Sequence, residues 1–238
     1  MQSALRSWGC DFARRPSTAM LARYPAWAPD DGALLVIAPH PNDEILGAGG
    51  LIRTWSAGGR EVRVLSLSDG EAADPGCEGL ASVRRGEVRE ALRKLCPTHV
   101  SVTRLGLPDG RIGEHLNRLR NAMLPFCRER LTLIAPYEHG GHPDHEGVGA
   151  LCVDFARSQN VRIARYTFRD PLRSAAGAAH KTVNPGRWVR FDLSEDARRA
   201  KARAIECFRS QIDSMVGKAE GPTYALDHVQ RSYEAFIL

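Results

Sequence analysis

Two short segments of this 238-residue chain combine histidines with carboxylates. Residues 39–44 read P-H-P-N-D-E, and residues 138–146 read E-H-G-G-H-P-D-H-E. Two histidines and one carboxylate are a common ligand set for a catalytic zinc, whose fourth position stays open for water. Proline fixes φ at about −65°, which pre-organises a turn and aims the side chains beside it. Together the two segments indicate a catalytic zinc site.

Each segment also has a simpler interpretation when it is taken alone. Asp43 and Asp144 both stand where a helix is expected to begin, and aspartate is a favoured N-cap residue. The presence of both segments at equivalent places in the expected fold favours chemistry over capping.

The elements that must position these residues can be read from apolar patterns. Residues 33–38 read A-L-L-V-I-A and precede the first segment, and the apolar run 131–135 precedes the second. Continuous apolar runs are typical of strands that are covered on both faces. Further strands are expected over 62–67, 100–105, 161–168 and 187–193, helices over 45–56, 83–95, 114–130, 146–158 and 195–214, and loops over 71–80 and 169–185.

This alternation predicts an α/β fold: a single-domain, Rossmann-like, mostly parallel sheet with helices on both faces. The domain is expected to span residues 1–238, with residues 1–30 as an N-terminal arm. Ligands of such sheets bind where strand ends meet helix starts, and both segments fall there. A dinucleotide-binding oxidoreductase would need G-x-G-x-x-G directly after the first strand, whereas glycines 47–50 lie inside the expected helix.

Composition narrows the classes of function. The chain has 33 basic and 28 acidic side chains, a net charge of +5, and 43% hydrophobic residues, values that exclude global disorder, collagen, coiled coils and small disulfide scaffolds. Acidic residues interrupt the basic runs, as on solvated helix faces, so no nucleic-acid partner is expected. The six cysteines include no C-x-x-C pair and favour free thiols in a reducing cytoplasm. No apolar run reaches the ~18 residues of a membrane span, and no secretory signal is expected.

Several motifs together resemble those of the LmbE-like, or PIG-L, zinc-dependent deacetylases. That family carries P/A-H-P-D-D-E after its first strand and H-P-D-H after a later one, where this chain has P-H-P-N-D-E at 39–44 and H-P-D-H at 142–145. Three further segments, S-D-G-E at 68–71, R-R-G-E at 84–87 and L-G-L-P-D-G at 105–110, resemble the family's T-D-G-E, R-x-x-E and L-G-L-P-D-G. The resemblance covers about residues 34–168, and the C-terminal third has no matching motif.

The resemblance implies a function. It points to a Zn²⁺-dependent hydrolase that cleaves a linear amide bond and so removes an acetyl or other acyl group from an N-acetylated amino sugar or sugar conjugate. His40, Asp43 and His145 match the three zinc ligands of the family. The implied partner is a small-molecule substrate.

The resemblance also assigns roles to residues around the zinc. Asn42 occupies the position of the general base, which is an aspartate in the family. His142 matches the histidine that assists the tetrahedral intermediate and the leaving amine, and Asp144 matches the residue that orients this histidine. Arg84 and Asp109 match positions that contact the sugar.

Asn42 leaves three interpretations open. An amide cannot take a proton at neutral pH, and loss of a general base typically costs about 10²–10⁴ in rate. The asparagine is a substitution that keeps the fold and traps substrate, or it is natural and Glu44, Asp144 or His142 acts as the base. Alternatively, the chain is a catalytically silent carbohydrate- or metabolite-binding protein on an enzyme scaffold. The sequence predicts neither the particular substrate nor the oligomeric state.

Overall fold

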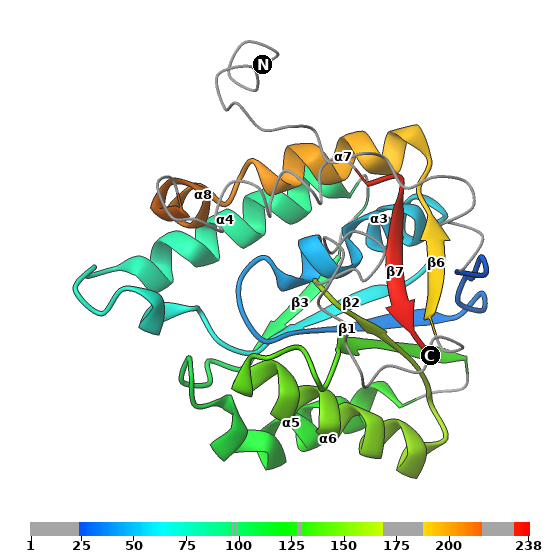
Figure 1. Cartoon of the computed structure of the whole chain (residues 1–238), viewed down its shortest axis with the longest axis horizontal. Coiled ribbons are helices and arrows are strands. Elements are labelled where there is room, and N and C mark those ends of the chain that lie inside the picture. The colour runs from blue at the N-terminus through cyan, green and yellow to red at the C-terminus, as the bar shows by residue number, and fades with distance from the viewer. Residues whose placement is uncertain (1–23, 97, 99, 128–129, 169–187, 216–230) are drawn as a thin grey trace, which may run out of the picture.

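The computed structural model describes residues 24–96, 98, 100–127, 130–168, 188–215 and 231–238. These residues form a seven-stranded sheet with helices packed on both of its faces (Figure 1). The strands are β1 (Ala33–Ala38), β2 (Val62–Ser66), β3 (Ser101–Arg104), β4 (Leu131–Pro136), β5 (Arg162–Tyr166), β6 (Trp188–Asp192) and β7 (Tyr233–Ile237). The helices are α3 (Asp43–Ala57), α4 (Leu80–Leu95), α5 (Leu116–Met123), α6 (Pro143–Gln159), α7 (Glu195–Ile205) and α8 (Arg209–Met215), with 3₁₀ turns at Glu71–Ala73, Ile112–His115 and Leu124–Phe126.

The predicted mostly parallel sheet is confirmed. Its strand order is β3-β2-β1-β4-β5-β7-β6, and the first five strands in this order pair in parallel. β1 and β4 are neighbours at the centre, and their apolar side chains are almost entirely buried. Because both strands run in the same direction, the two His/Asp segments leave the sheet at the same edge.

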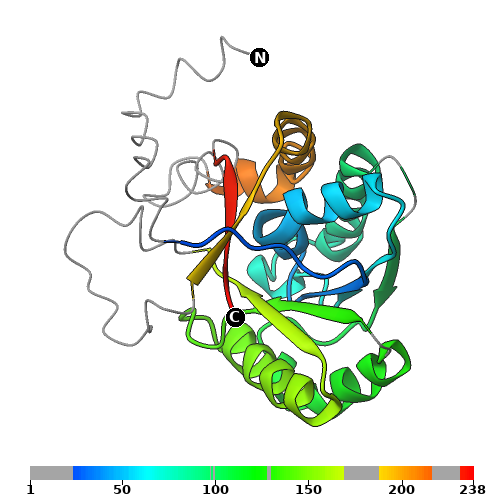
Figure 2. The same cartoon turned by 90° about the vertical axis from the view of Figure 1, so that its right-hand side faces the viewer.

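The helices lie in two layers, as predicted. α3, α4 and α7 cover one face of the sheet and enclose one apolar core, and α5 and α6 cover the other face around a second core. Figure 2, turned by 90°, shows these layers on opposite sides of the sheet. The predicted helix over 114–130 is short because Pro125 falls in the 3₁₀ turn that ends it, in agreement with the interruption expected at this proline.

The C-terminal part differs from the sequence prediction in two places. β7 was not predicted, and it pairs antiparallel with both β5 and β6. The expected helix over 195–214 is two helices, α7 and α8. The last turn of α7 tightens through i to i−3 hydrogen bonds from Cys207 N–H and Phe208 N–H, which turns Phe208 into the core, where it is 2% exposed.

Part of the expected N-terminal arm packs on β6. The Tyr24 and Trp188 rings stack with their centroids 5.4 Å apart, and Ala26 forms a β-bridge with Arg190. Residues 1–23 and the expected loop over 169–185 lie outside the described residues. The extent of the arm and of the domain therefore stays a prediction.

The cysteines agree with one further expectation. All five cysteines that the structure describes are free thiols, while the cytoplasmic location that they favour stays a prediction. Among the described residues, no helix is both long enough and apolar enough to cross a membrane.

α3 is kinked in its middle, and the C-terminal elements cap the kink. Ala48 has φ −145° and ψ 18°, outside the helical range, so the two halves of the helix leave backbone groups unpaired. The Glu234 carboxylate of β7 accepts the N–H groups of Gly50 and Leu51 at 2.7 and 2.9 Å. Lys201 of α7 donates to the Leu46 carbonyl at 2.8 Å and to Glu234 at 2.5 Å.

Gly47→Ala is expected to destabilise the fold, because the first half of α3 packs directly against an aromatic ring. A Cβ at Gly47 would lie 2.5 Å from Cδ2 of Tyr166, whose hydroxyl donates to the Ile37 carbonyl at 2.9 Å. Such overpacking typically costs about 1–3 kcal/mol, which chemical denaturation measures. The control is Gly86→Ala in α4, where nothing lies within 4 Å of the new Cβ and alanine is the better helix former. Equal stability of the two variants would contradict the close packing.

Candidate metal centre and active-site cavity

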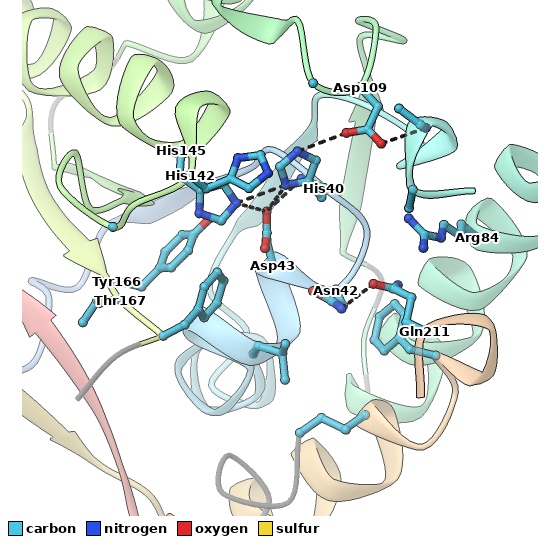
Figure 3. Close-up of a pocket in the computed structure, with 18 of the residues that line it drawn as sticks. His40, Asn42, Asp43, Arg84, Asp109, His142, His145, Tyr166, Thr167 and Gln211 are labelled. Atoms are coloured by element: carbon cyan, nitrogen blue, oxygen red, sulfur yellow. Dashed lines mark hydrogen bonds and ion pairs between the residues drawn. The ribbon is translucent and has the colours of Figure 1, made fainter. Parts of the chain in front are cut away.

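The two His/Asp segments meet in a cavity of about 630 Å³ at the C-terminal ends of β1 and β4 (Figure 3). Of the eight residues that the sequence singles out, seven line this cavity: His40, Asn42, Asp43, Arg84, Asp109, His142 and His145. The eighth, Asp144, is buried behind the histidines, with 2% of its surface exposed. The structure therefore brings the whole predicted site together.

A tight turn places the first two predicted ligands side by side. Asp43 N–H donates to the His40 carbonyl at 3.2 Å, and His40 N–H donates to the Asp43 carboxylate at 2.8 Å. Asn42 between them has φ 97°, in the left-handed region where asparagine is among the best tolerated residues after glycine. The segment thus turns His40 and Asp43 toward the cavity.

The ligand atoms of His40, Asp43 and His145 form a compact triangle. His145 Nε2 lies 3.1 Å from His40 Nδ1 and 3.1 Å from Asp43 Oδ2, and the third side, from His40 Nδ1 to Asp43 Oδ2, is 3.5 Å. Ligand atoms about 2.0–2.1 Å from a tetrahedral zinc are about 3.3 Å apart. These three residues therefore fit a zinc ion without rearrangement of the side chains.

Two other groups of side chains could also hold a metal. His40, His142 and His145 form one group, and His40, Asp109 and Asp144 form the other, each with ligand atoms within 4.8 Å of one another. The triangle that contains Asp43 is more compact than this limit. In this arrangement the exposed His142 is not a metal ligand and lies beside the metal position. The centroids of the His142 and His40 rings are 4.8 Å apart.

Asp144 acts on His40 through its carboxylate. Asp144 Oδ2 lies 3.0 Å from His40 Nε2, and the carboxylate also accepts the N–H groups of Gly110 and Ile112 at 2.9 and 3.0 Å. A carboxylate behind a ligating imidazole fixes its tautomer and orientation. Among the described residues, the hydrogen bond to the His142 side chain comes from the Asp144 backbone N–H, 3.3 Å from His142 Nδ1. Orientation of His142 by Asp144 stays a prediction, and the backbone rather than the carboxylate makes this contact.

Carboxylates surround His40 and determine its charge. Burial disfavours the imidazolium, but hydrogen bonds to Asp109, Asp43 and Asp144 outweigh this effect and raise the pKa of His40 to about 11. Burial likewise disfavours ionised Asp43, yet the charges and hydrogen bonds of His145 and His40 hold the pKa of Asp43 below its usual range. The surrounding groups thus stabilise a positive charge at this place, whether a proton or a metal ion carries it.

Arg84 and Asp109 also line the cavity, and Asp109 lies against His40. Arg84 is buried and donates to the Gly70 carbonyl at 2.6 Å, and its Nε has no hydrogen-bond partner among the described residues. Asp109 Oδ1 lies 3.2 Å from His40 Nε2, and Asp109 Oδ2 accepts Ala72 N–H at 2.9 Å. The buried, unpaired donor of Arg84 is suited to a polar group of a substrate.

The sequence did not point to the wall that the C-terminal third contributes. Ile205, Phe208, Gln211 and Ile212 line the cavity from α7, α8 and the turn between them. Gln211 accepts a hydrogen bond from Asn42 Nδ2 at 2.6 Å and donates one to the Pro41 carbonyl at 3.0 Å. Because this part of the chain carries no motif and lies some 170 positions from Asn42, no sequence pattern could have identified it.

Comparison with known proteins gives the family. Residues 35–156, just over half of the chain, match the family model "PIG-L: GlcNAc-PI de-N-acetylase". Diacetylchitobiose deacetylase of Thermococcus kodakarensis is 31% identical over an alignment of 201 residues that covers 75% of this chain and 70% of that protein.

Two solved structures share the fold. N,N'-diacetylchitobiose deacetylase of Pyrococcus horikoshii is 24% identical, with a TM-score of 0.62 over 87% of this chain and 83% of that one. The zinc-inhibited form of teicoplanin deacetylase Orf2 is 19% identical, with a TM-score of 0.65 over 86% of this chain and 97% of that one. The motifs are in register with those of the family, the family model matches over half of the chain, and a curated relative is 31% identical. This chain therefore belongs to the PIG-L, or LmbE-like, de-N-acetylase family.

Proposed function

We propose that this protein is a Zn²⁺-dependent hydrolase that removes the acetyl, or another acyl, group from an N-acetylated amino sugar or sugar conjugate, at a rate that Asn42 limits. The observation that carries the proposal is the triangle of His40 Nδ1, Asp43 Oδ2 and His145 Nε2, with sides of 3.1–3.5 Å, at the cavity. Relatives named as diacetylchitobiose and teicoplanin deacetylases support the substrate class.

The residues around the triangle have distinct roles in this proposal. His40, Asp43 and His145 would hold the zinc, which when bound would supply Lewis-acid activation of water and of the acyl carbonyl. Asp144 holds the His40 ring through Nε2, and Arg84 and Asp109, which line the cavity, bind polar groups of the sugar.

His142 serves as the proton donor. The Asp144 N–H points at His142 Nδ1, so the neutral imidazole carries its proton at Nε2. Through Nε2–H the ring can donate a hydrogen bond to the developing oxyanion. Once it is protonated to the imidazolium, it can give the Nε2 proton to the departing amine and return to the neutral form.

None of the three residues that the sequence offered as substitutes, Glu44, Asp144 and His142, is well placed to act as the missing general base. Glu44 is 1% exposed and does not line the cavity, and burial raises its pKa to about 8. The Asp144 carboxylate is buried against two backbone N–H groups and His40, and His142 already holds its proton on the side away from Asp144. This accounting supports the proposal that Asn42 slows the reaction.

His145→Ala is expected to remove both the metal and the activity. Loss of one of three protein ligands leaves too few to hold zinc. Mutation of a residue that only supports a metal ligand typically costs about 10–100-fold in activity, and amine release should fall by more than this when a ligand itself is lost. Elemental analysis gives the zinc content, and amine release from diacetylchitobiose and other N-acetylated amino sugars gives the activity.

His139→Ala is the matched control for this test. His139 is an exposed histidine of the same loop and is not among the residues that line the cavity, so its replacement should preserve zinc and activity. Full zinc content in the His145→Ala protein, or a native protein that binds no zinc, would overturn the proposal.

The alternative function, a catalytically silent carbohydrate- or metabolite-binding protein, is favoured by one observation. The general-base position holds an amide while the rest of the site is intact. A silent protein would bind N-acetylated sugars and release no amine from them, even after a carboxylate is restored at position 42.

A further inference from the structure

Gln211 joins α8 to the loop that carries the metal ligands. Its side chain contacts two consecutive residues of that loop, and Figure 3 shows its contact with Asn42. Gln211 Nε2 donates to the Pro41 carbonyl at 3.0 Å, and Gln211 Oε1 accepts from Asn42 Nδ2 at 2.6 Å. Because Gln211 is only 9% exposed, water competes little for the groups that form these hydrogen bonds.

The chemistry of the three partners determines which way each amide faces. A carbonyl oxygen can only accept, so the Pro41 carbonyl requires the NH₂ group of Gln211. Gln211 Oε1 then faces position 42, which must donate. Asparagine can donate there, whereas an ionised aspartate cannot. If the Gln211 amide turned over to serve an aspartate, its oxygen would face the Pro41 carbonyl oxygen.

The backbone of α8 is held in place from the other side. Glu87 of α4 accepts Ser210 N–H and Ser210 Oγ–H, both at 2.7 Å, and Phe208 is buried in the core. The Gln211 backbone therefore cannot easily move away from position 42 if the residue there is an unfavourable partner. Glu87 belongs to the R-R-G-E segment, so this motif holds α8 as well as supplying Arg84 to the cavity.

From these contacts we infer that Gln211 is a positioning residue that fixes the orientation of the Asn42 amide at the cavity. Asn42 Nδ2 is engaged by Gln211, which leaves Oδ1 as the polar atom of this side chain that can accept a hydrogen bond from the attacking water. Gln211 thus acts on the reaction through Asn42, an inference that rests on the proposed function. The Gln211 oxygen that faces position 42 also suits this position to an amide rather than a carboxylate.

A double-mutant cycle tests this inference on the zinc-loaded full chain. The proteins are the native chain, Gln211→Leu, Asn42→Asp and the double variant, and kcat, KM and the melting temperature are measured for each. With Asn42 present, Gln211→Leu should lower kcat about three- to tenfold, the equivalent of one hydrogen bond, and change KM less than kcat. With aspartate at position 42, the same change should raise kcat, because it removes the facing oxygen.

The melting temperatures test the contact independently of activity. Asn42→Asp should lower the melting temperature by about 2–4 °C when Gln211 is present and by less when residue 211 is leucine. Gln159→Leu, at an exposed glutamine near the end of α6, controls for the change of residue type and should alter neither quantity. Equal effects of Gln211→Leu in both backgrounds would overturn the inference. If none of the four proteins releases amine, the proposed function fails, while the melting temperatures still test the role of Gln211.

Discussion

Asn42→Asp is expected to raise amine release from N-acetylated sugars by at least about tenfold, without changing the zinc content. The carboxylate supplies the general base that an amide at position 42 cannot provide. Asn42 is not part of the ligand triangle, so the metal should be unaffected. The expected gain lies at the low side of what a general base contributes, because Gln211 Oε1 faces the new carboxylate at short range.

Asn42→Gly is the matched control for this prediction. Glycine adopts the φ of 97° at this position without strain, so the turn is preserved while the side chain is lost. This variant should show no gain over the native protein. Equal activity of the native and Asn42→Asp proteins would contradict the assignment of the base position, and an Asn42→Asp protein that stays inactive would favour the silent binding protein.

Lys201→Met is expected to destabilise the protein by about 3–5 kcal/mol, because it leaves an uncompensated charge in the core. Lys201 and Glu234 are 2% and 3% exposed, and Lys201 Nζ lies 2.5 Å from Glu234 Oε1. The Leu46 carbonyl would also lose the hydrogen bond that Lys201 donates. Denaturation with urea measures the change in the free energy of unfolding.

Two further variants separate capping from charge pairing in this prediction. The exchange Lys201→Glu/Glu234→Lys restores opposite charges but places a donor against the N–H groups of Gly50 and Leu51, so it should not restore stability. Arg199→Met removes an exposed ion pair with Glu195 on the same helix and should leave stability unchanged within error. Full stability of the exchanged protein would show that only the charge pair matters.

The strands and helices whose residues show a clear local pattern of apolar side chains could be predicted from the sequence. β1 and β4 are continuous apolar runs that end in chemically distinctive turns, so both their place in the sheet and their loops follow from the residues. β7 reads Y-E-A-F-I, and its burial depends on an ion pair between Glu234 and a lysine on another element. Charged residues are almost never fully buried unless they are paired, so the sequence gives no reason to expect Glu234 in the core. Its partners are brought to it only by the folded structure.

The candidate site divides in the same way. His40, Asp43 and His145 could be predicted because their types and spacing within two short segments express a ligand set. The contact of Asp144 with His40 and the pairing of Gln211 with Asn42 could not, because each depends on where a side chain from a distant segment points. Such long-range pairs carry no signal in a single sequence.

The kink in α3 has a consequence for the order of folding. Asp43 lies at the start of this helix, but the groups that cap the helix at its kink come from residues 201 and 234, the latter 183 and 184 positions away from its partners. Contacts over such separations form late, because the loop that they close is long. During synthesis, the helix that carries Asp43 therefore gains its full support only after residue 234 has left the ribosome. The candidate metal site is thus completed late in folding, although Asp43 and His40 are made early.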